Sequence, residues 1–260
     1  MSLPKLLPDE RIDQVNEQLS LIQKKNGLTF GTDAYLLAAF IRSHPKATAV
    51  ELGGGTGIIS LLLAARKKVA SVTAVEVQPA FAELIGRNAE WNSLSDAVRP
   101  LCADLREITA STFGKEVDLV FSNPPYMKCD TGKRNEADEK YIARHEVCGG
   151  IADFCNAGAR LLRYGGRFVC VWRPDRLTEL LNALHDARLE PKRMTFVHAD
   201  ASSEPCMVLT EAVKGGSPSL YISPPLLLYL PMEEGETVRK LTPAAEEIYN
   251  TCQFSGLFSR

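Results

Sequence analysis

From residue 48 to residue 213, short apolar runs alternate with longer segments whose apolar residues recur at helical spacing. This alternation is typical of a parallel sheet with helices on both faces. It predicts a doubly wound, mostly parallel α/β sheet of seven strands. We expect strands at 49–52, 72–77, 98–103, 117–122, 167–172, 193–198 and 206–213, and helices at 58–66, 79–92, 151–162 and 174–188. A turn is expected at Gly165-Gly166, and Pro174 is expected to open the last of these helices.

The segments outside this alternation are shorter. Residues 19–30 alternate weakly around Asn26-Gly27, a pair suited to a tight turn, and predict a hairpin. A helix is expected from Ala34, capped by Thr32 or Asp33. After Lys214 the chain looks extended over 220–230 and helical over 242–250. The expected regions are an N-terminal hairpin and helix over the site (1–46), the main domain (47–214) and a C-terminal appendage (215–260).

Composition narrows the class of protein. The formal net charge is −2 over 260 residues, so any contact with nucleic acid should be local. Seven cysteines without CxxC pairs or zinc-type spacing predict reduced thiols and no metal site. The N-terminus lacks the pattern of a secretory signal, and no apolar run has the length of a membrane span. We therefore expect a cytoplasmic protein.

A glycine-rich loop, Glu51-Leu52-Gly53-Gly54-Gly55-Thr56-Gly57, lies between the first strand and the first helix of the sheet. Glycines there let the backbone turn sharply and approach a ligand closely. The dinucleotide fingerprint GxGxxG fails because Ile58 stands at its last position, and the phosphate loop GxxxxGK[ST] is absent. The loop therefore predicts a site for a cofactor other than these.

Acidic residues lie at or near the ends of three successive strands beside this loop. Glu51 belongs to the first, Glu76 is expected at the end of the second and Asp104 at the end of the third. Glu76, about twenty residues past the loop, is placed to accept hydrogen bonds from both hydroxyls of a ribose. Each acid alone could be a solvated residue at a strand end, but three beside one loop favour a binding site.

Asn123-Pro124-Pro125-Tyr126 directly follows the fourth strand, which should lie beside the first across the switch point of the sheet. An aromatic exocyclic amine is a poor nucleophile because its lone pair is delocalised into the ring. The Asn123 side-chain oxygen and the Pro124 carbonyl can accept its two N–H groups and direct the lone pair, and Tyr126 can stack on the base. These four residues are the expected catalytic residues, although the tetrapeptide alone could be a plain turn.

The glycine-rich loop and the tetrapeptide together resemble motifs of the Rossmann-like S-adenosylmethionine-dependent amino-methyltransferases. The resemblance implies that the loop lies behind the methionine part of the cofactor, with Glu51 near its positive charge and Asp104 near its adenine. The N-terminal part of the chain is also similar to a segment that closes over the cofactor. This similarity makes Thr32 and Asp33 candidate cofactor-binding residues, although Asp33 could be a simple helix cap. The implied cofactor-binding residues are Thr32, Asp33, Glu51, Gly53, Gly55, Gly57, Glu76, Asp104 and Asn123.

Further segments resemble the bacterial tRNA adenine-N6 methyltransferases that act next to the anticodon of a valine tRNA. They are Glu10-Arg11-Ile12-Asp13, Leu21-Ile22-Gln23, the run from Phe30 to Ala38, Ala143-Arg144-His145-Glu146, the run from Glu211 to Gly216, and Pro224-Pro225-Leu226. Together they cover nearly the whole chain. This chain has Gly54 where these methyltransferases often have Cys or Thr. It also has Glu51 where Asp is commoner.

The segment between Tyr126 and His145 carries cations and carboxylates in nearly equal number. Lys128 and Arg144 are candidate substrate contacts that could meet phosphates, or they could belong to a solvated loop. His145 could contact the substrate or cap the following helix. With Tyr126, these residues form the expected substrate site.

Three functions remain open at this point. The favoured one is N6-methylation of an adenine in RNA, with tRNA as the expected partner. The second is N5-methylation of a glutamine side chain on a protein, because Asn-Pro-Pro-Tyr can hold a planar amide equally well. The third is binding of cofactor or RNA without turnover. About fifty residues that begin with a hairpin precede the glycine loop, whereas the glutamine enzymes usually carry a helical domain there, which favours RNA. The oligomeric state is not indicated.

Overall fold

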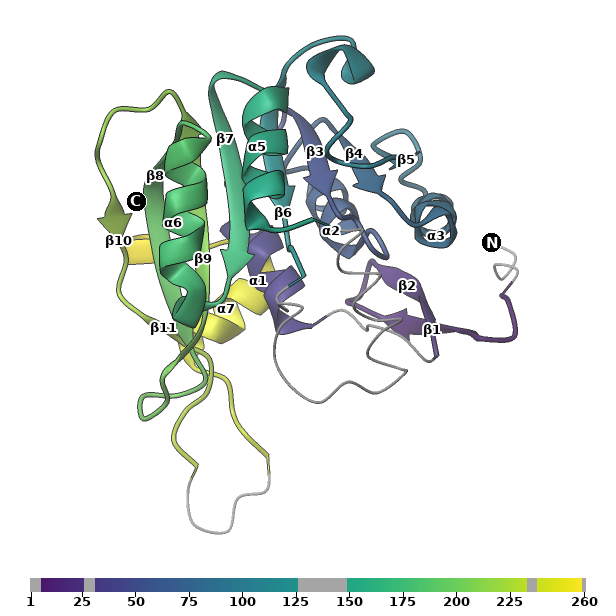
Figure 1. Ribbon diagram of the computed structural model, residues 1–260. Helices are drawn as coiled ribbons and strands as arrows, with labels where there is room; N and C mark the ends of the chain where they lie inside the picture. Colours follow the sequence, from purple (N-terminus) through teal and green to yellow (C-terminus); the bar gives the residue numbers. More distant parts are fainter. Residues whose placement is uncertain (1–5, 26–30, 126–148, 233–237, 259–260) are drawn as a thin grey trace, which may run out of the picture.

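The computed structural model describes residues 6–25, 31–125, 149–232 and 238–258 (Figure 1). Within this part of the chain, nine strands form one sheet in the order β10-β8-β9-β7-β6-β3-β4-β5, with β11 also paired to β8. The strands are β3 (Thr48–Leu52), β4 (Ser71–Glu76), β5 (Val98–Cys102), β6 (Val117–Ser122), β7 (Leu162–Trp172), β8 (Leu189–His198), β9 (Pro205–Lys214), β10 (Tyr221–Ile222) and β11 (Leu226–Leu227). Only β9 runs antiparallel to its neighbours among these strands.

Helices cover both faces of the sheet. In Figure 1, α5 and α6 lie in front of it, while α1, α2 and α7 lie behind. The helices are α1 (Thr32–Phe40), α2 (Ile58–Ala65), α3 (Pro79–Trp91), α5 (Ile151–Leu161), α6 (Leu177–Asp186) and α7 (Pro243–Thr251), with short 3-10 turns η1 (Ala110–Phe113), η2 (Pro174–Arg176) and η3 (Gly256–Phe258). The predicted doubly wound sheet and its seven main strands are confirmed, and β10 and β11 extend it.

The N-terminal hairpin exists, but its predicted position was wrong. It pairs β1 (Glu10–Gln14) with β2 (Ser20–Lys24), so its turn lies before residue 20. The Asn16 carboxamide oxygen accepts the amides of Gln18 and Leu19, both at 2.9 Å, and so closes this turn through a side chain. Asn26-Gly27 lies outside the described residues.

Three other local expectations need correction. The helix expected from Ala34 begins at Thr32, and its N-cap is Gly31, which makes no side-chain cap. Gly165-Gly166 lies inside β7 rather than before it, opposite an irregularity in the pairing with β6 that lets the strand continue. Pro174 opens the turn η2, after which α6 begins at Leu177.

Helix α1 is held in the core by a buried lysine. The Lys68 ammonium donates to the carbonyl oxygens of Ala38 at 2.7 Å and Ala39 at 3.1 Å, at the end of α1. It also donates to Cys252 O, just past α7, at 3.0 Å. Three donors therefore match three acceptors, and one side chain ties α1 to the C-terminal segment. Burial lowers the pKa of Lys68 to about 8, so it is still mostly charged at pH 7.

Replacing Lys68 should weaken this connection between α1 and the C-terminal segment. We expect Lys68→Met to lower the free energy of unfolding by about 1–3 kcal/mol, because buried carbonyl oxygens lose their donor. Urea unfolding at pH 7 measures the change. Lys67→Met is the matched control, since Lys67 is exposed and should change stability by less than about 0.5 kcal/mol. Equal stability of the two variants would contradict the role of Lys68.

Candidate active site

The glycine loop between β3 and α2 is fastened to the neighbouring strand. The amides of Gly53 and Gly54 both donate to Val75 O of β4 at 2.9 Å. Gly53, Gly55 and Gly57 have φ angles of +74°, +53° and +83°, in the left-handed region that favours glycine. A Cβ built on Gly55 would meet nothing within 4 Å, so open space lies beside the loop there. A ligand could occupy this open space.

Gly54 faces the protein instead. A Cβ on Gly54 would lie 2.9 Å from Ile85 Cδ1 and 3.2 Å from Ala74 Cβ. Ile85 on α3 therefore occupies the space that a larger side chain at position 54 would need.

Glu51 lies under the loop with 1% of its surface exposed. Its carboxylate accepts the Ser60 amide at 3.3 Å and the Ser60 hydroxyl, from the first turn of α2. Burial raises the pKa of Glu51 to about 8, although the bonds from Ser60 oppose this shift. A nearby positive charge would favour its ionised form, so the position suits a cationic ligand. Sequence reasoning missed Ser60, because nothing in the sequence indicates that its hydroxyl faces Glu51.

Glu76 contacts the glycine loop directly. Its Oε2 accepts the Gly55 amide at 2.9 Å and its Oε1 accepts the Gln78 amide at 3.0 Å. Because each carboxylate oxygen has two lone pairs, both can accept a further hydroxyl donor. The side chain is buried at the carboxyl end of β4, beside the open space at Gly55.

Asp104 lies next to Glu76, two residues beyond the end of β5. The amide of Ala103 donates to Glu76 O at 3.1 Å, which holds the two segments together. Asp104 accepts the Arg106 amide at 2.8 Å and forms an ion pair with the Arg106 guanidinium. These contacts hold the pKa of Asp104 below its usual value. The structure thus brings two predicted acids and the glycine loop to one edge of the sheet.

Asn123 follows β6 at the same edge. The Ser122 hydroxyl donates to Leu52 O at 2.7 Å, which joins the end of β6 to the start of the glycine loop. The Asn123 amide nitrogen donates to Asp33 Oδ2 at 2.8 Å. Pro124 is buried and Pro125 half-buried. Three segments distant in sequence, the first turn of α1, the glycine loop and the end of β6, therefore meet here.

Thr32 and Asp33 both belong to the first turn of α1. Because Gly31 is the N-cap, the alternative in which Asp33 caps the helix is wrong. Thr32 lies near Tyr249 of α7, whose pKa is raised by burial. Tyr126, Lys128, Arg144 and His145 lie outside the described residues, so their expected contacts remain predictions.

Asn88, which sequence reasoning missed, joins the hairpin to the glycine loop. Its amide nitrogen donates to Thr56 O at 3.0 Å and to Ile22 O at 3.1 Å, and its oxygen accepts the Ile22 amide at 2.7 Å. A buried asparagine inside a helix is a weak signal from sequence. It becomes meaningful only when its three backbone partners are known.

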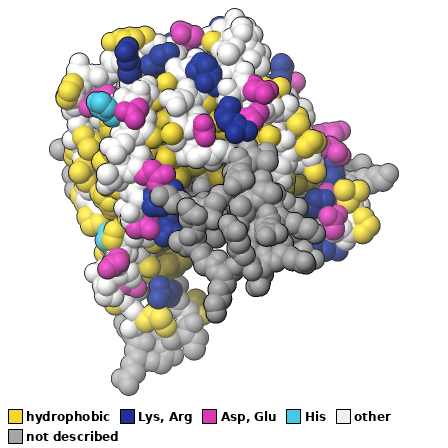
Figure 2. Space-filling view, in the orientation of Figure 1, with side chains coloured by type: hydrophobic (Ala, Val, Ile, Leu, Met, Phe, Trp, Pro, Cys, Tyr) yellow, Lys and Arg dark blue, Asp and Glu magenta, His cyan; other side chains and the backbone are white. Residues whose placement is uncertain are grey.

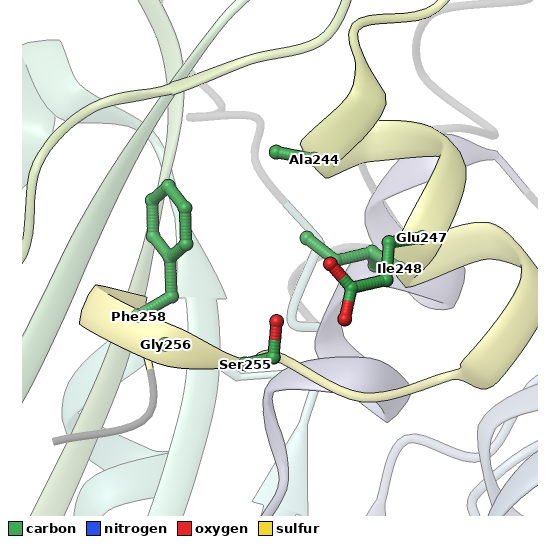
Figure 3. A pocket seen from close by; sticks show the side chains of 6 residues that line it. All are labelled: Ala244, Glu247, Ile248, Ser255, Gly256 and Phe258. Carbon is green, nitrogen blue, oxygen red and sulfur yellow. The ribbon is translucent and has the colours of Figure 1, made fainter.

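A separate cavity of about 230 Å³ lies between α7 and η3 (Figure 3). It is lined by Ala244, Glu247, Ile248, Ser255, Gly256 and Phe258. Among the described residues, no predicted site residue lines it, and Glu247 is the one charged residue in its lining. We therefore place the candidate site at the glycine loop, where the predicted residues converge.

The sequence profile of the methyltransferase small domain family matches residues 25–186. The chain belongs to this family. The prediction of an S-adenosylmethionine-dependent methyltransferase is thereby confirmed. No helix in the described part of the protein is long and apolar enough to cross a membrane.

Similar proteins include a tRNA1(Val) (adenine(37)-N6)-methyltransferase of Porphyromonas gingivalis, 29% identical over 187 residues that cover 70% of this chain and 72% of that protein. Another with the same name, from Phocaeicola vulgatus, is 29% identical and covers 74% of this chain and 80% of its own. A crystal structure of a predicted O-methyltransferase, Atu636 of Agrobacterium tumefaciens, superposes with a TM-score of 0.67 at 23% identity, covering 86% of this chain and 98% of that one. The structural likeness supports the fold.

The raised pKa of Glu51 gives the apoprotein a measurable pH dependence. Because the folded protein holds this proton more tightly, the stabilisation is complete below the ordinary pKa of 4.5 and is lost as the pH rises toward about 8. Across this window the loss is of the order of a few kcal/mol, at about 1.4 kcal/mol per unit. Urea unfolding from pH 4.5 to 8.5 measures it.

We expect Glu51→Gln to remove this part of the pH dependence, because the amide does not ionise. Glu90→Gln on the exposed side of α3 is the control and should follow the parent curve. A Glu51→Gln curve parallel to the parent curve would show that Glu51 titrates normally.

Proposed function

We propose that this protein transfers the methyl group of S-adenosylmethionine to the N6 amine of an adenine in tRNA, next to the anticodon. The observation that carries the proposal is the position of Asn123 beside the glycine loop, fixed by the bond from Ser122 to Leu52 O. The similar proteins named as tRNA adenine-N6 methyltransferases support the choice of substrate. The bound cofactor supplies an electrophilic methyl group at this edge of the sheet.

The described residues fit that cofactor. Gly55 leaves open space where a side chain would stand, and Glu76 beside it can accept ribose hydroxyls. Glu51 offers a buried carboxyl group whose ionised form a cationic methionine end would favour, and Asp104 would serve the adenine end. Gly53 and Gly57 shape the loop through their positive φ angles. Thr32, Asp33 and Asn123 border the proposed cofactor site, where the first turn of α1 meets the end of β6.

The amine that receives the methyl group is held by hydrogen-bond acceptors at the end of β6. The Asn123 side-chain oxygen and the Pro124 carbonyl accept its two N–H groups, so that the nitrogen lone pair points toward the methyl group. The two prolines limit the backbone torsions of the turn and fix the spacing of these acceptors. Tyr126 stacks on the base, and Lys128, Arg144 and His145 contact the surrounding nucleotides.

The surface charge is consistent with local recognition of RNA. On the face drawn in Figure 2, Lys and Arg side chains of the described residues lie among Asp and Glu side chains. The formal net charge is −2, so the chain as a whole does not attract phosphates. We therefore expect affinity for RNA to depend on a few cations near the site.

Removing the side chain of Asn123 tests the mechanism. Asn123→Ala should slow methyl transfer by about 10²-fold or more, the scale seen when one preorganised hydrogen-bonding group is lost from an active site. Its affinity for S-adenosylmethionine, measured by calorimetry, should change little, because the glycine loop and Glu76 are intact. Unchanged transfer by this variant would overturn the mechanism.

The substrate is tested separately with cofactor that carries a labelled methyl group. The protein is incubated with unmodified bacterial tRNA and, in parallel, with a protein extract. We expect label in the tRNA. Label in the protein fraction alone would favour glutamine methylation, and cofactor binding without label in either fraction would favour the binding-only alternative.

A further inference from the structure

We propose that Asp33 is a positioning residue that orients the side-chain amide of Asn123 for catalysis. This inference rests on the proposed function, because it concerns the group that holds the substrate amine. It goes further by giving the carboxylate of α1 a role that is distinct from contact with the cofactor.

The terminal amide of the Asn123 side chain is nearly symmetric in shape. Its oxygen and nitrogen are nearly the same size, so a half-turn of the terminal group exchanges an acceptor for a donor. Only the oxygen can accept an N–H group of the substrate. In the reversed orientation, two donors would face each other and the amine would lose its alignment.

Asp33 selects between the two orientations. The Asn123 nitrogen lies 2.8 Å from Asp33 Oδ2. An ionised carboxylate accepts hydrogen bonds and donates none, so only the nitrogen of the amide can face it favourably. The bond to a charged acceptor is also stronger than one between neutral groups. The opposite end of the amide is therefore its oxygen.

The backbone before α1 leaves room for this carboxylate. A Cβ on Gly31 would lie 2.7 Å from Asp33 Oδ1, closer than two such atoms can approach. The φ angle of Gly31 is −108°, which other residues adopt without strain. Gly31→Ala should therefore preserve the helix while pushing the carboxylate away from Asn123. This variant displaces the proposed contact without altering either partner.

The C-terminal segment fixes the helix that carries Asp33. The Tyr35 hydroxyl of α1 donates to Tyr249 O of α7 at 2.6 Å. The two tyrosine rings also pack at 5.0 Å between centroids. Helix α7 therefore holds the first turns of α1, and through them the carboxylate at Asn123.

The experiment compares single-turnover methyl transfer to unmodified tRNA with cofactor affinity from calorimetry. We expect Asp33→Ala, Asp33→Asn and Gly31→Ala to lower the transfer rate by about 10- to 100-fold, because misplacement of a reacting group by about 1 Å can cause a loss of that size. The amide of Asp33→Asn can accept or donate, so it does not select one orientation of Asn123. The dissociation constant for S-adenosylmethionine should stay within about twofold.

Two further readouts separate positioning from a merely structural role. If Asp33 acts through Asn123, the double variant Asp33→Asn with Asn123→Ala should be no slower than Asn123→Ala alone. In the protein without cofactor, the side-chain amide protons of Asn123, identified in nitrogen-15 NMR spectra by their loss in Asn123→Ala, should shift in Asp33→Ala. Equal melting temperatures establish that the variants are folded.

The outcomes distinguish the two proposals. An active Asn123→Ala variant would overturn the proposed function itself. Loss of activity in Asn123→Ala, with full activity in both Asp33 variants, would overturn only the role of Asp33. Weaker cofactor binding by the Asp33 variants at an unchanged rate with saturating cofactor would make Asp33 a cofactor ligand instead, and multiplicative effects in the double variant would show that it acts independently of Asn123.

Discussion

The pairing of β3 with β6 at the centre of the sheet determines the rest of the site. These strands run parallel, with Glu51 opposite Phe121, so their carboxyl ends lie at the same edge. The glycine loop leaves one strand there, and Asn123 leaves the other. The bond from the Ser122 hydroxyl to Leu52 O joins the two ends. Without this pairing, the candidate binding loop and the candidate acceptors would have no common position.

The peripheral elements are tied to the central part of the fold by side-chain hydrogen bonds. The hairpin is tied to the glycine loop through Asn88, and it is further fixed to α3 by the paired bonds of Arg87 with Glu10 at 2.8 Å. On the other side, Lys68 and Tyr35 join α1 to the C-terminal segment. The terminal regions therefore contribute to the site by holding in place the residues around the central loop.

The sequence predicted the central sheet well because most of its strands contain short apolar runs that alternate with segments of helical spacing. The strand 117–122 was predicted with its observed bounds, and the acids near the loop follow from the geometry of parallel strands. The hairpin was misplaced because its turn is closed by the Asn16 side chain rather than by Asn26-Gly27. The contacts Asn88–Thr56, Ser60–Glu51 and Asp33–Asn123 were not predictable, since each joins polar side chains or backbone groups through the tertiary fold and leaves no periodic pattern.

The central claim is that acceptors at the end of β6 direct an adenine amine at the methyl donor. The most direct test is mass-spectrometric analysis of the nucleosides in unmodified tRNA after incubation with the protein and S-adenosylmethionine. The account predicts the appearance of N6-methyladenosine. Methylation of guanine, or of a ring nitrogen of adenine, would contradict it, because neither presents an exocyclic adenine amine to Asn123 and Pro124.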